Sequence, residues 1–211
     1  MREETRTIVF AAVVCVVCSL LLSGMAAGLK ERQEANMAFD VKRNIVKAFG
    51  FDISNKKEWT RPKIEETYEM HVSEEVINDL PIYTWTEEGS DEPSKYAFPI
   101  SGKGLWSVLY GYLALNSDLE TVAGISFYKH GETPGLGAEI EKSWFQSQFA
   151  GKTVYKDGTP VDFEVTKPGY ATGESAVDGI SGATITGKGV QALIRKDLAS
   201  YASYFNSIKG N

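Results

Sequence analysis

Residues 105–128 read LWSVLYGYLALNSDLETVAGISFY, and their pattern governs the fold that we expect for most of the chain. The first part, Leu105–Leu115, is rich in aromatic residues and partly alternates in polarity, which is typical of a β-strand. Asn116–Asp118 has the composition of a turn, and Thr121–Tyr128 has the composition of a second strand. Two strands joined by a short turn predict an antiparallel hairpin.

Downstream of this hairpin, helical spacing becomes the dominant pattern. A loop over His130–Gly137 precedes a predicted helix over Glu139–Phe149, and Val161–Val165 is predicted to be a short strand. A long amphipathic helix is predicted to begin near Gly187. Its apolar residues recur at helical spacing and are Val190, Leu193, Ile194, Leu198, Tyr201, Phe205 and Ile208.

Upstream, the pattern is weaker. Lys30–Phe49 has the spacing of a helix, with Gly50 as its stop signal. Glu69–Val72 and Ile82–Thr86 are predicted to be short strands, and Glu87–Ser94 a solvated loop. Together these segments predict an α+β fold, with a mostly antiparallel sheet and packed helices.

The N-terminal stretch Thr7–Leu29 carries no charged residue. As a helix it would be about 34 Å long, enough to cross the hydrocarbon core of a bilayer. A cleaved signal peptide ending near Met25–Gly28 is the alternative, but the apolar run is long for one. We therefore favour an uncleaved transmembrane helix. The basic residues on its two sides are balanced, so charge does not predict the orientation.

Composition narrows the range of functions. The chain has 211 residues and a net charge of −6, and an acidic surface disfavours nucleic acid as a partner. Cys15 and Cys18 both lie in the apolar run, where small membrane-compatible side chains are the simplest interpretation. His71 and His130 are the only histidines. They form no pair with metal-ligand spacing and no serine–histidine–acid set, so we expect no metal site.

The segment Asp178–Thr186, DGISGATIT, leads directly into the last predicted helix. A helix start presents unpaired N–H groups and the positive end of the helix dipole, which together can hold a phosphate. Lys188 adds a positive charge in the first turn. From local chemistry alone the simpler hypothesis is that a hydroxyl of this segment caps the helix and that nothing binds there.

A nucleotide-binding loop is a second interpretation of the same region. Gly182–Gly189, GATITGKG, nearly matches the pattern G-x-x-x-x-G-K-[ST]. Gly189 stands where the hydroxyl that binds Mg²⁺ is required, and no strand directly precedes the loop. Only one helix follows, which leaves no room for the rest of such a domain. We therefore reject a nucleotide hydrolase.

Asp178–Thr184, DGISGAT, resembles the flavinylation motif of the FMN-binding domain family. The resemblance implies that Thr184 is joined to the phosphate of FMN as a phosphoester, and that Thr186 is not. It implies that Asp178 belongs to the motif and that Ser181, Gly182 and Ala183 lie against the cofactor. A separate flavin transferase, with FAD as donor, would install the group.

Two further blocks support this resemblance. Gly131–Gly137, GETPGLG, is similar to the family's flavin-contacting loop, which implies contacts from Glu132, Thr133, Gly135 and Leu136; alone, it would be interpreted as a plain turn. Gly102–Ser107, GKGLWS, resembles a segment of the C subunit of the Na⁺-translocating NADH:quinone reductase. Trp106 is expected near the flavin ring, although a buried core tryptophan is an equal alternative.

The resemblance implies a complete architecture. A short tail over residues 1–6 would precede a transmembrane helix over 7–29, a juxtamembrane helix over 30–50 and an FMN-binding domain over 51–211. The domain would lie on the periplasmic side of the cytoplasmic membrane, in contact with lipid and the other subunits of the redox complex.

The implied function is electron relay within a sodium-transporting NADH:ubiquinone reductase, a translocase. No dinucleotide fingerprint is present, so we expect NADH to bind elsewhere. The alternatives are the G subunit of an Rnf-type ferredoxin:NAD⁺ oxidoreductase, which shares the SGAT and ETPGLG blocks, and a non-redox binding domain on a membrane stalk.

Overall fold

The computed structural model describes residues 2–209 and divides the chain into two units, one ending at Asp40 and the other beginning at Val41. Residue 1 of the predicted tail and residues 210–211 of the predicted domain lie outside the described residues. The division into tail, anchor, juxtamembrane helix and domain stays a prediction.

The first element is the helix α1, Glu3–Ala48, which contains the whole apolar run. Its most apolar 18-residue window has a mean hydropathy of 2.7, and none of that window is buried within the protein. The helix is therefore long and apolar enough to span a membrane, as an anchor requires, although a leader sequence would have the same properties. It ends where predicted, because Gly50 adopts a φ of 95° and donates its N–H to Lys47.

The second unit is built on a five-stranded antiparallel sheet in the sequential order β1-β2-β3-β4-β5. The strands are β1 Val72–Ile77, β2 Leu80–Thr86, β3 Pro93–Lys103, β4 Val108–Asn116 and β5 Val122–Lys129. The predicted hairpin is β4 and β5, with Leu113 opposite Ile125. Its turn is closed by Asp118, whose Oδ1 accepts the N–H groups of Glu120 and Thr121.

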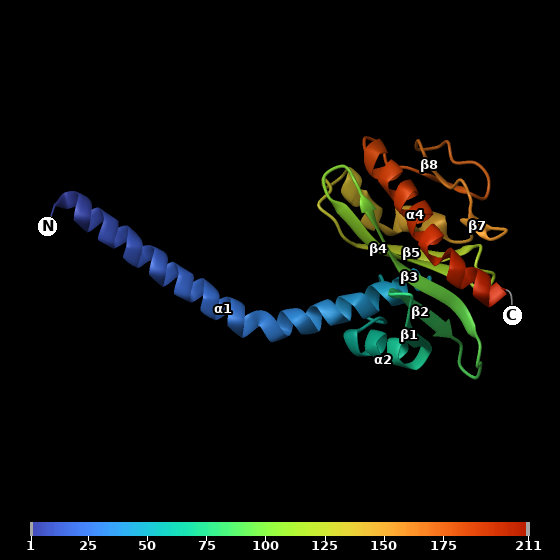
Figure 1. Cartoon of the computed structure of the whole chain (residues 1–211), viewed down its shortest axis with the longest axis horizontal. Coiled ribbons are helices and arrows are strands. Elements are labelled where there is room, and N and C mark those ends of the chain that lie inside the picture. Colours follow the sequence, from blue (N-terminus) through green and yellow to red (C-terminus); the bar gives the residue numbers. More distant parts are fainter. Residues whose placement is uncertain (1, 210–211) are drawn as a thin grey trace. The chain divides into compact units, whose positions relative to one another are not determined.

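Helices cover both faces of this sheet (Figure 1). The long helix α4, Thr184–Lys209, packs on one face, mainly against β3. On the other side, α2, Arg61–His71, packs beside β1 and β2. The last turn of α1 is anchored to β5, where Ser126 donates its hydroxyl to the carbonyl of Asn44. The α+β fold predicted from the sequence is thus confirmed.

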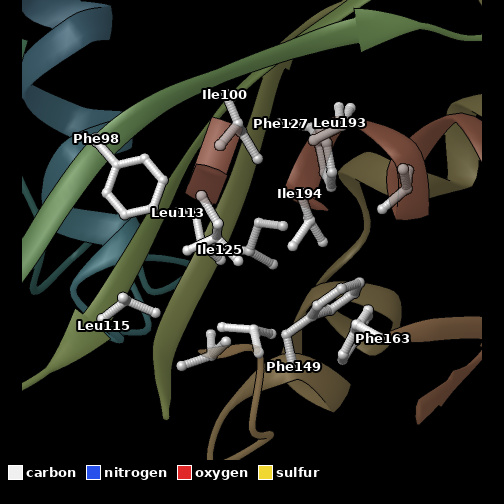
Figure 2. Close-up of a cluster of buried hydrophobic side chains, with 14 of the residues drawn as sticks. Phe98, Ile100, Leu113, Leu115, Ile125, Phe127, Phe149, Phe163, Leu193 and Ile194 are labelled. Atoms are coloured by element: carbon white, nitrogen blue, oxygen red, sulfur yellow. The ribbon is translucent and has the colours of Figure 1, made fainter. Parts of the chain in front are cut away.

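The main core lies between the sheet and α4 (Figure 2). Leu193 and Ile194 of α4 point toward β-strand residues and toward the segment that follows β5. Burial of these apolar side chains supplies the main favourable term for folding. The labelled core residues are Phe98, Ile100, Leu113, Leu115, Ile125, Phe127, Phe149, Phe163, Leu193 and Ile194.

Short elements connect β5 to α4. They are the 3₁₀ helix η1 Gly137–Glu141, α3 Ser143–Gln146, the 3₁₀ helix η2 Ser147–Phe149, and the strands β6 Tyr155–Lys156, β7 Thr159–Pro160, β8 Glu164–Thr166 and β9 Ala176–Asp178. Strands β8 and β9 form a small parallel pair that leads into the last helix.

Several predicted boundaries are wrong. Glu69–His71 is the end of α2 and not a strand, since Ile64, Thr67 and Tyr68 bury one helical face. Leu105–Ser107 is a turn, because its N–H groups bond to a side chain and not to a neighbouring strand. The helix predicted over Glu139–Phe149 is broken at Lys142, whose backbone is extended.

Two errors concern the region around the DGISGAT segment. The strand predicted over Val161–Val165 lies at Glu164–Thr166, where its pairing with β9 fixes the register. The last helix begins at Thr184, three residues earlier than predicted. The first helical hydrogen bond is made by Gly187, which donates its N–H to the carbonyl of Ala183.

Candidate functional site

The start of α4 is held by a tight turn. Ala183 is buried and donates its N–H to Ile180, and Gly182 adopts a φ of 74°, a conformation that favours glycine. Thr184 is the first helical residue and is exposed. Within the described part of the chain, the N–H groups of residues 184–186 have no protein acceptor. The helix therefore presents free donors beside an exposed hydroxyl.

Thr186 has the opposite orientation. Two residues along a helix rotate the side chain by about 200°, so Thr186 faces inward where Thr184 faces outward. Thr186 is only 1% exposed. Its hydroxyl donates to Oε2 of Glu132 over 2.6 Å, in a contact between residues 54 positions apart.

Glu132 is a buried carboxylate at the centre of the site. In addition to the Thr186 hydroxyl it accepts three backbone N–H groups, from Leu105, Trp106 and Ser107, at 2.9–3.2 Å. Burial alone would raise the pKa of Glu132, but these hydrogen bonds together hold the pKa below its ordinary value. The side chain therefore carries a stable negative charge that joins three segments of the chain.

Two glycines make room for this carboxylate. A Cβ at Gly104 would lie 2.7 Å from Oε1 of Glu132. A Cβ at Gly137 would lie 2.7 Å from the Thr186 hydroxyl and 2.8 Å from Oε2 of Glu132. Any side chain at either position would displace the pair. The lack of a side chain at Gly104 in the GKGLWS segment and at Gly137 in the ETPGLG segment is thus explained by the space that Glu132 and Thr186 occupy.

Exposed apolar side chains surround the start of α4. Trp106 is 73% exposed, which rules out the alternative of a buried core tryptophan. Leu136 and Ile185 are also exposed, and a Cβ on Gly182 would lie 3.0 Å from Cδ2 of Leu136. The ETPGLG loop is therefore in contact with the turn that precedes Thr184. Flat apolar groups can pack on such a surface.

Asp178 organises the other side of the segment. Its Oδ1 accepts the N–H groups of Tyr170 and Ala171, and its backbone is bracketed by the side-chain amide of Gln148. An open hollow of about 630 Å³ lies beside this arrangement. It is lined in part by Gly135, Trp144, Gly169, Asp178 and Ser181.

His130 supports the ETPGLG loop from its first residue. Its Nδ1 accepts the N–H of Glu132 at 3.2 Å, so the proton of a neutral ring lies on Nε2. That Nε2 is 2.9 Å from Oε1 of Glu141, although the angle is unfavourable for a hydrogen bond. The described residues contain no group of three histidine, cysteine or acidic side chains that could hold a metal ion.

Comparison with known proteins identifies the family. Residues 104–199, which contain the ETPGLG and DGISGAT segments and all but the first two residues of GKGLWS, match the family model of the FMN-binding domain. The C subunit of the Na⁺-translocating NADH-quinone reductase from Vibrio alginolyticus is 34% identical over 212 residues, covering 83% of each chain. The chain belongs to this C-subunit family.

Other relatives agree. The C subunit from Pseudomonas aeruginosa is 31% identical over 240 residues, with 92% of this chain and 90% of the relative covered. The crystal structure of the C subunit from Parabacteroides distasonis superposes with a TM-score of 0.70 at 31% identity, over 82% of this chain and 94% of that one. Shewanella oneidensis NqrC has the same TM-score at 22% identity, which supports the fold alone.

The three segments predicted to form the site are brought together in this C-subunit homologue. The Glu132 carboxylate joins the segments that contain Trp106, Thr133 and Thr184, while Leu136 and Gly182 are in contact. Asp178 lies at the far end of its own segment and binds a different turn. The roles predicted for these residues, and for Ser181, Ala183 and Gly135, stay predictions.

Sequence reasoning missed the inward role of Thr186 and the structural roles of Gln148 and His130. The helical period would have placed Thr186 opposite Thr184 if the helix had been started at residue 184. Nothing in the local sequence indicated that Gln148, 30 residues away, bonds to the backbone of Asp178.

Proposed function

We propose that this chain carries FMN joined through its phosphate to Thr184, as a phosphoester threonine, and uses it to relay electrons. The proposal rests on the exposed Thr184 hydroxyl at the start of a 26-residue helix, within a domain of the FMN-binding family. The helix dipole and the free N–H groups would stabilise the negative charge that a phosphodiester keeps. Lys188, exposed in the second turn of α4, adds a complementary charge.

The surrounding residues fit such a group. Trp106, Leu136 and Ile185 offer exposed apolar surface for a flat ring, and the glycines beside them allow close approach of the backbone. Ser181, Gly182 and Ala183 would form the turn under the phosphate, and Glu132, Thr133 and Gly135 the loop beside the ring. Bound FMN would supply the redox chemistry, while the protein orients it and tunes its electrostatics.

The family suggests the place of the chain in a larger assembly. We infer that it works with the other subunits of a sodium-transporting NADH:ubiquinone reductase, and that NADH binds elsewhere in the complex. The apolar helix α1 would anchor it in the cytoplasmic membrane, with its FMN domain on the periplasmic side. A flavin transferase would act there during maturation. The C-subunit relatives favour this interpretation over the Rnf-type protein, and the FMN-binding family match favours it over a non-redox binding domain.

Fluorescence after denaturation tests the covalent bond. The full chain, made together with an active flavin transferase, should give a fluorescent band on a denaturing gel under ultraviolet light. Thr184→Ala should remove the fluorescence while the protein band remains, because the acceptor oxygen is gone. Ser203→Ala, which removes an exposed hydroxyl elsewhere on α4, should keep it. A dark native band, or a fluorescent Thr184→Ala band, would refute the proposal.

A further inference from the structure

The Glu132 side chain has no spare capacity for a ligand. Its two oxygens accept three backbone N–H groups and one hydroxyl, and the residue is 5% exposed. A carboxylate that is buried and fully hydrogen-bonded is a fixed charge and costs a great deal to disturb. Glu132 therefore acts on a bound group through the segments it joins and through its charge, and not by direct contact.

The Thr186 hydroxyl makes a side-chain hydrogen bond from the first turn of α4, where few backbone hydrogen bonds are made. The first turn is held by the Gly187 N–H bond to Ala183, while the N–H groups of residues 184–186 have no protein acceptor among the residues that the structure describes. A side-chain bond at residue 186 fixes the rotation of this turn about the helix axis. Because Thr184 lies about 200° around that axis, the same bond keeps the Thr184 hydroxyl on the outer surface.

The backbone is closed around the pair. Gly104 and Gly137 lie so close to these two side chains that a Cβ at either position would clash with them. The same carboxylate also sets the position of Trp106, through its N–H at 2.9 Å. One buried group thus links the first turn of α4, which carries the acceptor hydroxyl, to the backbone of the segment that carries Trp106.

The geometry points to Glu132 and Thr186 as a positioning pair that sets the rate of flavin attachment at Thr184 and lowers the potential of the attached flavin. This inference rests on the proposed function above. Attachment requires the Thr184 hydroxyl to face outward, and the pair selects that orientation. A fixed negative charge beside a redox group disfavours the addition of an electron, so the anion of Glu132 lowers the midpoint potential.

Variants at residue 186 test the predicted effect on the rate of flavin attachment. They are made as the full-length chain together with an active flavin transferase. Thr186→Val keeps the shape but loses the hydroxyl, whereas Thr186→Ser keeps the hydroxyl. The loss of a hydrogen bond to a charged group should slow attachment about tenfold or more in Thr186→Val. Thr186→Ser and the surface control Ser200→Ala should attach flavin at close to the native rate. A native rate in a folded Thr186→Val would overturn the inference.

Glu132→Gln tests the predicted effect on the midpoint potential. The potential is measured on the molecules that carry flavin. This change removes the charge but nearly keeps the shape, so the midpoint potential should rise relative to the native protein and to Thr186→Ser. Thermal unfolding of each variant separates loss of folding from loss of positioning. If Glu132→Gln does not fold, the Val and Ser pair at residue 186 still decides whether the pair sets the rate of attachment. An unchanged potential in folded Glu132→Gln would overturn the electrostatic part. Absence of covalent flavin from the native chain would instead refute the proposed function itself.

Discussion

At the scale of single residues, the site depends on a buried negative charge that the protein stabilises with hydrogen bonds. Glu132 lies among glycines and a threonine, and its hydrogen bonds are local enough to keep it ionised. A group whose pKa is lowered by folding stabilises the folded state only while it is ionised. The contribution is present above the pKa of the unfolded chain and is lost as the pH falls through the folded pKa.

Because this stabilising contribution is lost at low pH, we expect the domain to lose stability in acid. As the pH falls below the ordinary range of a glutamate, the native protein should lose stability progressively, and Glu132 should contribute to that slope. Glu132→Gln should be less stable at neutral pH but should show a flatter acid slope. Denaturant unfolding midpoints measured across the acid range check this, with Glu88→Gln in the exposed loop as control. Parallel slopes for native protein and Glu132→Gln would contradict it.

At the scale of elements, α4 is placed by close approach to the strand β3. A Cβ on Gly102 would lie 2.5 Å from Cβ of Leu193, and a Cβ on Gly189 would lie 2.4 Å from the carbonyl oxygen of Lys103. The helix and strand therefore pack backbone to backbone near the site. This contact positions the first turns of α4 next to the loop that contains Trp106.

Gly189→Ala should consequently destabilise the domain, because the added methyl group meets backbone and not a flexible side chain. We expect a loss of about 1–3 kcal/mol in the free energy of unfolding, as for overpacking in a core. Lys188→Ala, one residue earlier and exposed, should stay within about 0.5 kcal/mol. Denaturant titration measures both, and equal stabilities would contradict the packing argument.

Elements with strong local patterns were predictable from sequence. The β4–β5 hairpin, the loop after it, and the apolar stripe of α4 follow from period and turn chemistry. β3 was not predicted, because its burial alternates only partly and two of its residues are proline. The break at Lys142 depends on tertiary packing of the short helices around it, and the periodicity of apolar residues in the sequence does not predict such packing.

The candidate site was predictable only in part, for a similar reason. The DGISGAT and ETPGLG segments could be singled out by their residues, but their contact is a property of the fold. The bond between Glu132 and Thr186 spans 54 residues, so the sequence did not indicate it. The inward direction of Thr186 follows from the helical period only if the helix begins at Thr184. The exposure of Trp106 likewise follows from the turn at 105–107, where a strand had been predicted.

At the scale of the whole molecule, the described residues combine one apolar helix long enough to span a membrane with a domain whose relatives are C subunits of Na⁺-translocating NADH-quinone reductases. An uncleaved anchor predicts that the native protein stays in the membrane fraction in high salt and is released by detergent. Protease added to intact spheroplasts should digest the domain, because the domain faces outward in our proposal. A domain that resists until the membrane is broken would place it on the inner side.

The most direct test of the covalent flavin is the mass of the peptide that contains the start of α4. The native chain is produced with a flavin transferase whose activity is verified on another substrate, and is then digested and fragmented in a mass spectrometer. The proposal predicts one peptide heavier by the mass of FMN less one water, with fragment ions that place the addition on Thr184. An addition on Ser181 or Thr186, or an unmodified peptide, would contradict it.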